Sequence, residues 1–268
     1  MAGRLFFSRQ GHFPLVGSTN DVVRGWLADG TPEVCLAVAD EQSAGRGREG
    51  RSWQAPSGAA LLASLGFRPT WLPPERAWRL AAITSLAMAE AAEAVAELKP
   101  GTIRLKWPND LVVERDGGPL KLAGVLGETD GLGSDDPRVV VGIGVNADWA
   151  AADFPADLQT SMTSLREIGG GRPVDRDRLL EAFTDRLETQ VEALRDGRFD
   201  GAAWAARQAT TGRTVTIETH DGRREVVAAA GVNEVTGALE LESADGTERS
   251  VVSAEVVHVR VAATGTRM

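Results

Sequence analysis

The sequence has few of the residues that most often carry covalent or metal chemistry. Of its 268 residues only Cys35 is a cysteine, so no internal disulfide can form, and its three histidines are scattered. Scattered histidines give no local support for a zinc site or for a histidine-based catalytic triad. Cys35 stands in the apolar run VCLAVA, where a cysteine is expected to be a buried core residue rather than a nucleophile.

Long apolar runs and a positive net charge are absent as well. No stretch approaches the roughly 18 apolar residues of a membrane span, and the opening MAGRLFFSRQGHFPL has no apolar core long enough for a secretion signal. A formal net charge of −9 argues against general binding to nucleic acid or to an anionic membrane. We therefore expect a cytoplasmic globular protein, for which 43% hydrophobic and 25% charged residues are ordinary values.

Two common nucleotide-binding motifs are missing too. The P-loop pattern GxxxxGK[ST] does not occur. GIGVNA at 142–147 lacks the third glycine of a dinucleotide-binding turn and does not open a convincing helix, which argues against a dinucleotide fold.

Apolar spacing predicts helices over three ranges: 18–30, 75–98 and 175–195. The first ends at Gly30, and the third begins with Asp175 as its cap. The second places Glu90, Glu93 and Glu97 away from its apolar side, toward solvent.

Short apolar runs predict strands, which continue to the end of the chain. Candidates in the first part are EVCLAVAD, ALLASLGF, TIRLKW, LVVE, LAGVLGE and RVVVGIGV. From about Thr210 the strands alternate around Asp-Gly turns, in TVTIET-HDG-RREVVA and ALELES-ADG-TERSVVS. The prediction is an α+β domain over residues 1–209, with a mixed or antiparallel sheet and packed helices, followed by a small β-barrel over 210–268.

The segment EQSAGRGREGRSW, residues 41–53, interleaves Arg46, Arg48 and Arg51 with glycines. One interpretation is a solvated surface turn. A second is an RNA-binding segment, although such segments usually repeat and carry aromatics between the arginines. A third is a loop that closes over an anionic ligand, with arginines supplying bidentate contacts and backbone amides supplying further donors.

KWPND, residues 106–110, ends a predicted strand on a lysine. Lys106 has apolar neighbours, and a buried lysine is costly unless it is paired, so we expect an anion or Asp110 as its partner. The Pro-Asn-Asp sequence is also a good turn, but a turn alone accounts for neither Lys106 nor Trp107.

Two glycine-containing strands carry further polar residues. Lys121 precedes a strand whose Gly124 permits close backbone approach. Gly142 and Gly144 remove side chains near Asn146, whose amide could read an adenine edge. Glycine in a strand more often marks a bulge than a binding site, so the bland interpretation stays open for each of them.

Taken together, GSTN, EQSAGRGREGRSW, KWPND, KLAGVLGE and GIGVN, in this order and at these separations, resemble the biotin–protein ligase family. TSL at 163–165 and the terminal β region are similar as well, so the resemblance covers nearly the whole chain. It implies a class II synthetase-like catalytic domain followed by an SH3-like β-barrel. Some members carry an N-terminal helix-turn-helix repressor domain, but only seventeen residues precede Ser18, so we expect the monofunctional type with no DNA partner.

The resemblance implies an ATP-dependent ligase that forms biotinyl-5′-AMP. The biotinyl group would pass to one lysine of a biotin carboxyl carrier domain, in an acetyl-CoA or acyl-CoA carboxylase or a pyruvate carboxylase. ATP, biotin and Mg²⁺ are the implied cofactors and substrates. We expect no membrane partner and a monomer or homodimer.

The resemblance also implies site residues. Those implied as catalytic are Lys106, Arg48 and Lys121. The biotin-binding set is Ser18, Thr19, Asn20, Gln42, Gly45, Arg46, Gly47, Arg48, Lys106 and Gly124. The set for ATP and the adenylate is Arg46, Arg48, Arg51, Trp53, Lys106, Asn109, Lys121 and Asn146, and Asp110 is the candidate magnesium ligand. For Trp53, a core position is the alternative to covering biotin.

Two other functions stay open at this point. A lipoate or octanoyl ligase or transferase shares the general fold, but the acyl-enzyme type needs a placed cysteine, and Cys35 is in an unsuitable apolar run. A non-catalytic sensor would bind biotin or nucleotide without releasing pyrophosphate. The presence of both Lys106 and Lys121 counts against a sensor.

Overall fold

The first part of the chain folds around a seven-stranded mixed sheet. The structure, a computed structural model, describes residues 6–116, 118–219, 224–243, 245–252 and 256–261. The strands are β1 (Arg9–Val16), β2 (Cys35–Gln42), β3 (Ala60–Phe67), β4 (Ile103–Lys106), β5 (Asp110–Arg115), β6 (Gly118–Asp130) and β7 (Arg138–Asn146). They lie in the order β1-β2-β3-β7-β6-β5-β4, with β1 parallel to β2 and the other neighbouring pairs antiparallel.

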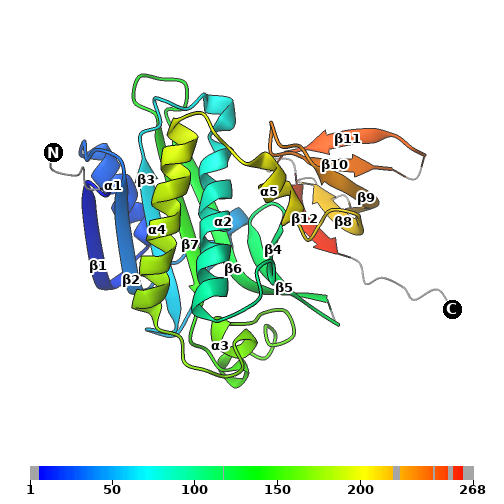
Figure 1. Cartoon of the computed structure of the whole chain (residues 1–268), viewed down its shortest axis with the longest axis horizontal. Coiled ribbons are helices and arrows are strands. Elements are labelled where there is room, and N and C mark those ends of the chain that lie inside the picture. The colour runs from blue at the N-terminus through cyan, green and yellow to red at the C-terminus, as the bar shows by residue number, and fades with distance from the viewer. Residues whose placement is uncertain (1–5, 117, 220–223, 244, 253–255, 262–268) are drawn as a thin grey trace.

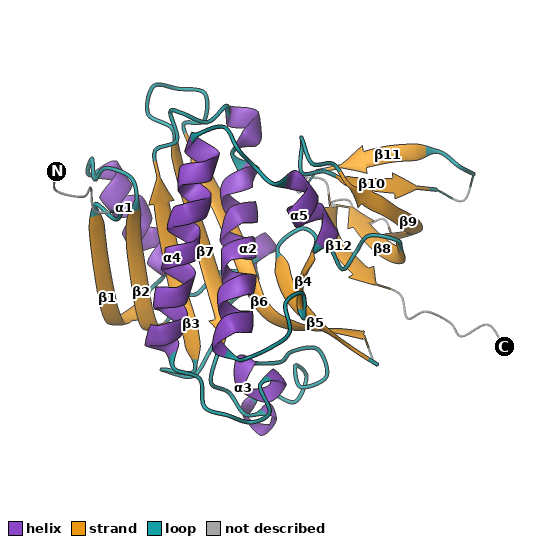
Figure 2. Cartoon of the chain, viewed as in Figure 1, coloured by secondary structure: helices purple, strands orange, loops and turns teal. Residues whose placement is uncertain are grey.

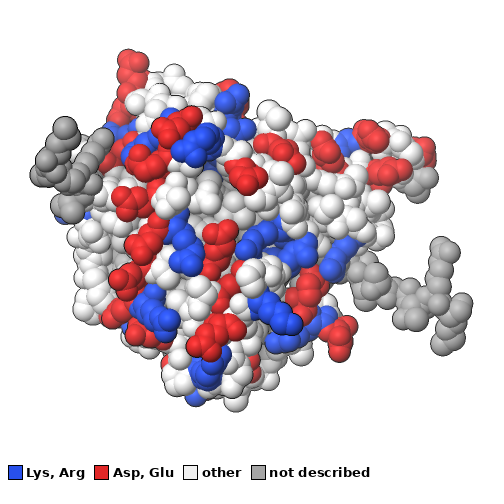
Figure 3. Space-filling view, viewed as in Figure 1, with Lys and Arg blue, Asp and Glu red and all other residues white. Residues whose placement is uncertain are grey.

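Helices cover both faces of this sheet. The long helices α2 (Trp78–Val95) and α4 (Arg176–Arg195) lie side by side over one face, and α1 (Thr19–Ala28) packs on the other (Figure 1). Shorter helices are α3 (Leu165–Ile168), α5 (Gly201–Ala206) and the 3₁₀ turns Arg48–Gly50, Pro74–Arg76 and Ala151–Asp153 (Figure 2). On the face that carries α2 and α4, acidic and basic side chains are interspersed, with no field of one sign (Figure 3).

The core explains why these segments fold as they do. All eight residues of β3 are buried between the two helical layers, as its continuous apolar run predicts. The predicted helix at 175–195 buries Phe183, Leu187 and Val191 completely, each contributing about 1.5–3 kcal/mol of transfer free energy. Asp175 caps this helix by accepting hydrogen bonds from the backbone amides of Asp177 and Arg178, which confirms the predicted cap.

The prediction that Glu93 faces solvent is wrong. Its side chain is buried on α2, where its carboxylate accepts the backbone N–H of Ile103 at 2.8 Å and both Nη atoms of Arg207 at 3.0 and 3.1 Å. Helical periodicity shows on which side of α2 Glu93 lies, but it does not show which residues from other segments pack against that side. Arg207, which neutralises the charge, lies more than a hundred residues further along the chain.

Three strands or α-helices of the main domain were not predicted: β1, α3 and α5. Strand β1 lies at the edge of the sheet and is mostly exposed, so RQGHFPLV lacks the apolar run or clean alternation of a covered strand. Helix α5 has only six residues, too few to show a period.

The C-terminal β domain contains β8 (Arg213–Thr219), β9 (Arg224–Val232), β10 (Leu239–Glu242), β11 (Glu248–Val251) and β12 (Val256–Val261). These form an antiparallel sheet in the order β11-β10-β9-β8-β12, consistent with a small SH3-like domain. The predicted α+β fold with its small terminal β domain is confirmed. The HDG turn lies in residues that are outside the described part, and the boundary between 209 and 210 stays a prediction.

Candidate active site

A cavity of about 650 Å³ lies on the face of the main sheet opposite α2 and α4, a size suited to a small organic ligand. The start of α1, the loop after β2, the β4–β5 turn and strands β6 and β7 form its walls. Fourteen of the predicted site residues line it: Ser18, Thr19, Asn20, Gln42, Arg46, Gly47, Arg48, Arg51, Trp53, Lys106, Asn109, Asp110, Lys121 and Gly124. Segments separated by more than a hundred residues in the sequence thus meet at one cavity.

A buried polar network forms the end of the cavity nearest α1. The Oε1 atom of Gln42 accepts the backbone N–H of Thr19 at 2.7 Å and its hydroxyl at 3.0 Å. The hydroxyl of Ser64 lies 2.7 Å from Thr19 Oγ1 and 2.5 Å from Asn20 Oδ1. These fixed donors and acceptors suit a polar head group rather than an apolar ligand.

Sequence reasoning missed two members of this network, Ser64 and Glu128. The Nδ2 atom of Asn20 donates to Glu128 Oε2 at 2.6 Å, which fixes the orientation of the Asn20 amide. Ser64 is fully buried in β3, and a hydroxyl inside the otherwise apolar run ALLASLGF was the available signal. Glu128 gave no such signal, because a glutamate near a strand end is usually solvated.

Ion pairs hold Arg46 at the rim of this end. Its two Nη atoms each lie 2.7 Å from an oxygen of Asp21, and one also lies 3.5 Å from Glu128. Arg24 pairs with the same two carboxylates, at 2.9 and 2.7 Å. The hydrogen bond from Arg46 is the largest cause of the lowered pKa of Asp21, outweighing the opposing effect of desolvation. Arg46 therefore ties the loop to α1 and β6.

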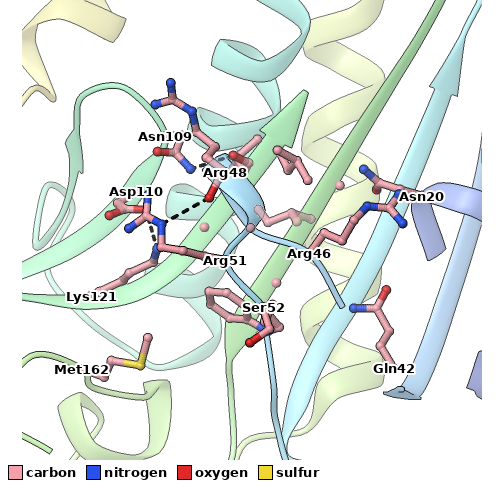
Figure 4. A pocket seen from close by; sticks show the side chains of 18 of the residues that line it. Asn20, Gln42, Arg46, Arg48, Arg51, Ser52, Asn109, Asp110, Lys121 and Met162 are labelled. Carbon is pink, nitrogen blue, oxygen red and sulfur yellow. Dashed lines mark hydrogen bonds and ion pairs between the residues drawn. The ribbon is translucent and has the colours of Figure 1, made fainter. Parts of the chain in front are cut away.

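The arginine loop folds back on itself as a tight hairpin (Figure 4). The amide of Gly47 donates to the carbonyl of Arg51 at 2.6 Å, and the amide of Trp53 donates to the carbonyl of Gly45 at 2.9 Å. A Cβ on Gly45 would stand 2.3 Å from the Trp53 carbonyl oxygen, so this close approach requires glycine. Gly45 itself does not line the cavity. It shapes the loop that does.

Trp53 lies on the glycines of the sheet. A Cβ on Gly144 would stand 2.6 Å from the Trp53 ring, and one on Gly124 would stand 3.3 Å from it. A Cβ on Gly142 would likewise stand 2.2 Å from Asn20 Oδ1. Gly124, Gly142 and Gly144 were expected to leave room, and the room that they leave is filled by side chains of the cavity wall. Trp53 is half-buried at the cavity and is not a core tryptophan.

Cationic side chains gather at the other end of the cavity. Lys106 and Asp110 are paired in register where β4 and β5 meet, and the Nζ atom of Lys121 lies 2.7 Å from Asp110 Oδ1 (Figure 4). Arg48 is half-buried near them, and this burial lowers the pKa of its guanidinium group. Five cations and one carboxylate line the cavity, a balance that favours an anionic ligand.

The last wall comes from the loop after β7. Leu158, Ser161 and Met162 line the cavity, and the backbone of Lys121 pairs with this loop through Ser161 and Thr163, at 2.8 and 2.9 Å. Asn146 does not line the cavity. It is buried and donates from Nδ2 to the carbonyl of Thr163 at 3.0 Å, so in this structure it supports the wall from behind.

Known proteins resemble the chain closely. The sequence model of the biotin/lipoate A/B protein ligase family matches residues 12–146. The chain belongs to this family. It is 34% identical to the biotin–[acetyl-CoA-carboxylase] ligase of Mycobacterium tuberculosis, over 91% of this chain and 86% of that protein. It is 37% identical to the bifunctional ligase/repressor BirA of Escherichia coli, over 67% of this chain and 52% of BirA.

Solved structures agree with the sequence comparison. The biotin protein ligase from Aquifex aeolicus in complex with biotin and ATP superposes with a TM-score of 0.78 and 25% identity, over 96% of this chain and all of that chain. The biotin protein ligase from Leishmania major in complex with biotinyl-5-AMP gives a TM-score of 0.55 at 25% identity. The resemblance to the biotin–protein ligases and the prediction of a ligase are confirmed.

The side chains of the cavity could bind Mg²⁺ only in a limited way. Among the described residues no group of three or more His, Cys, Asp or Glu side chains could hold a metal ion. In the part of the chain that the structure describes, Asp110 is the single carboxylate that lines the cavity, and it is already paired with Lys121. One carboxylate fits a Mg²⁺ ion that arrives on substrate phosphates, but it does not fit a cage made by the protein alone.

No helix of the described residues is long and apolar enough to cross a membrane.

Proposed function

We propose that this chain is an ATP-dependent biotin–protein ligase that makes biotinyl-5′-AMP and transfers the biotinyl group to a carrier lysine. The acceptor we propose is a biotin carboxyl carrier domain of an acyl-CoA or pyruvate carboxylase. The observation that carries this proposal is the polarity of the cavity, with a hydrogen-bonding network of hydroxyl and amide groups at one end and clustered cations at the other. Biotin has matching ends, a ureido ring and a carboxylate.

We assign the head group to the network formed by Thr19, Asn20 and Gln42, with Ser18 beside it in the cavity wall. These side chains are ordered by one another and by Ser64, so few rotamers would be lost on binding. Gly124, Gly142 and Gly144 leave the sheet bare beneath the middle of the cavity, where the ring and valeryl chain of biotin would lie against Trp53.

Adenylation joins two anions, which is the problem that the cationic end addresses. An oxygen of the biotin carboxylate attacks the α-phosphorus of ATP, the bond to the bridging oxygen breaks, and pyrophosphate leaves. Lys106, Lys121 and Arg48 reduce the repulsion between the reactants and neutralise charge that develops on the phosphate. Mg²⁺ on the polyphosphate would stabilise the leaving group, with Asp110 as the side chain available to it.

We propose that Arg51 and Asn109 contact phosphate or ribose, a role supported by their position in the cavity lining. We propose that Asn146 meets the adenine only after a local shift of the wall that it supports, and that Gly45 acts through the shape of the loop.

In the second step of the reaction the neutral amine of the carrier lysine attacks the carbonyl carbon of biotinyl-5′-AMP, AMP leaves, and the amine loses a proton.

The test is pyrophosphate release measured with ATP and with biotin, lipoate, octanoate or no acid, followed by mass analysis of a carrier domain. Biotin-dependent release and a biotin mass shift on one lysine are expected. Release with lipoate or octanoate instead would make the chain a lipoate or octanoyl ligase, and binding without release would make it a sensor.

We further propose that the enzyme works in the cytoplasm. We propose that it is a monomer or a homodimer, two states that light scattering distinguishes.

A further inference from the structure

The C-terminal β domain contacts the main domain directly behind Lys106. Trp107 follows Lys106 in the chain, is 4% exposed, and points away from the substrate cavity toward the β domain. Its indole Nε1–H donates to the carbonyl of Gly237 at 2.9 Å, and its backbone N–H donates to the hydroxyl of Thr210 at 3.2 Å. The first bond joins the β4–β5 turn to the β domain itself, and the second joins this turn to the segment that leads into the domain.

The segment that leads into the β domain is also fastened to β4. Residues 207–209 pair with Leu105 through two backbone hydrogen bonds, at 2.9 and 2.6 Å. The Nε atom of Arg104 donates to the carbonyl of Arg207 at 3.0 Å, and Arg207 is held in turn by the buried Glu93. In Figure 1, β4 and α5 lie where the main sheet meets the β domain. Strand β4, which ends at Lys106, therefore has the interdomain segment as its outer neighbour.

The turn of the β domain that touches Trp107 is held by hydrogen bonds to Asn233. Asn233 Oδ1 accepts the amides of Val235 and Thr236 at 3.0 Å, and the Gly237 amide donates to the Asn233 carbonyl at 2.8 Å. Gly237 has φ +74°, and a Cβ there would stand 2.7 Å from the Trp78 ring. The turn thus fits between two tryptophans and needs glycine at its tip.

The β4–β5 turn is held from its other side by the main sheet. The Asn109 side chain donates to the carbonyl of Val125 at 3.0 Å, and the Val125 amide donates to the carbonyl of Asn109 at 2.8 Å. Trp107 and Asn109 are two residues apart and are anchored to different domains. Lys106 and Asp110 are the register partners that flank them.

We propose that Gly237 and Trp107 are positioning residues through which the C-terminal β domain fixes Lys106 and Asp110 for adenylation. This inference rests on the proposed function. Displacing the Gly237 turn would move Trp107 and shift the turn that carries both charged groups. The head-group network at α1 lies at the opposite end of the cavity and has no contact with Trp107 among the described residues. Biotin affinity and catalytic rate should therefore respond differently.

The experiment compares Gly237→Ala with Gly246→Ala in the full-length chain. Gly246 also has positive φ, +81°, in another turn of the same domain, but no atom lies within 4 Å of the position of its Cβ. Both variants carry similar backbone strain, and only Gly237→Ala pushes against the Trp78 ring and so displaces the turn whose carbonyl accepts the Trp107 indole N–H. We expect Gly237→Ala to lower kcat for biotin-dependent pyrophosphate release by roughly 10- to 100-fold, the scale of a small misplacement of reacting groups.

Two further measurements separate positioning from loss of fold. Biotin affinity of Gly237→Ala, measured by calorimetry, should fall by a much smaller factor than kcat, because the head-group network is distant from Trp107 and only the contact of the biotin carboxylate with Lys106 would be disturbed. Trp107→Phe, which keeps an aromatic ring but removes the Nε1–H, should lower kcat in the same direction and by less. Equal kcat for Gly237→Ala and Gly246→Ala, or parallel losses of kcat and biotin affinity, would overturn the inference. Absence of pyrophosphate release by wild type would instead reject the proposed function.

Discussion

The Nζ atom of Lys121 lies 2.7 Å from Oδ1 of Asp110 and 5.5 Å from the centre of the Trp53 ring. Lys121 therefore connects β6 to the start of β5 and to the last residue of the arginine loop. An ammonium group between a carboxylate and an aromatic face is well placed to exchange one partner for a phosphate oxygen. This arrangement makes the cationic end of the cavity responsive to the nucleotide.

Removing Lys106 should abolish most of the adenylation activity. Lys106→Ala takes a cation from the place where two anions are joined, and we expect a loss of about 3 kcal/mol or more of transition-state stabilisation, the scale of a lost oxyanion donor. The measurement is biotin-dependent pyrophosphate release. Lys99→Ala, at an exposed lysine after α2, is the matched control and should behave as wild type. Near-normal release by a folded Lys106→Ala protein would remove Lys106 from the site.

Removing Arg48 should release the intermediate. We expect Arg48→Ala to lose one or two charge-assisted contacts of about 1.5–3 kcal/mol each, which would speed escape of biotinyl-5′-AMP by roughly ten- to ten-thousand-fold. The free anhydride would then label lysines of a bystander albumin, and Arg198→Ala, at an exposed arginine, provides the control. Labelling that stays restricted to the carrier domain would show that Arg48 does not retain the adenylate.

The ion pair between Arg46 and Asp21 should control the mobility of the loop. Amide exchange of residues 43–52 should be faster in Asp21→Asn than in wild type, and it should slow in wild type when both substrates bind. Because the pKa of Asp21 is lowered, chiefly by the Arg46 hydrogen bond, this protection is present above about pH 4, the ordinary aspartate value, and is lost as the pH falls through the lowered pKa. A protection factor for these amides that stays constant over this pH range in wild type would contradict this account.

A methyl group at Gly144 should displace Trp53. The Cβ in Gly144→Ala would stand 2.6 Å from the indole, and overpacking of about 1–3 kcal/mol corresponds to a loss of roughly 5- to 150-fold in nucleotide affinity. Gly127→Ala, in the neighbouring strand, adds a Cβ with no atom within 4 Å and should bind normally. Equal affinities for ATP in the two variants would show that Trp53 does not shape the nucleotide site.

Cys35 should prove inert, which tests the acyl-enzyme alternative. Burial raises the pKa of its thiol to about 11, so little thiolate exists at neutral pH. We expect Cys35→Ala to keep full ligase activity while losing about 1 kcal/mol of folding stability, because the thiol fills the core next to Gly66. An octanoyl or biotinyl mass adduct on Cys35 during turnover would revive a covalent mechanism.

Much of the fold and many of the cavity residues followed from local pattern. Strand β3 and helix α4 were predictable because each buries a continuous run or a regular stripe of apolar residues. Lys106 was singled out because a buried lysine is costly without a partner, the arginine loop because its arginines alternate with glycines, and the role of Lys121 came from the family resemblance. Strand β1 and helix α5 were not, since an exposed edge strand and a six-residue helix carry little periodic signal.

What the sequence by itself determined is therefore which segments form elements and which charged groups need partners. Only the tertiary structure decided which residues those partners are. Glu93 is buried against Arg207, Arg46 binds Asp21, Lys121 pairs with Asp110, and Trp107 reaches Gly237 across a domain boundary. Local propensity depends on neighbours in sequence, whereas pairing of charges and glycine-made space depend on neighbours in three dimensions, which are fixed when distant strands are brought together in one sheet.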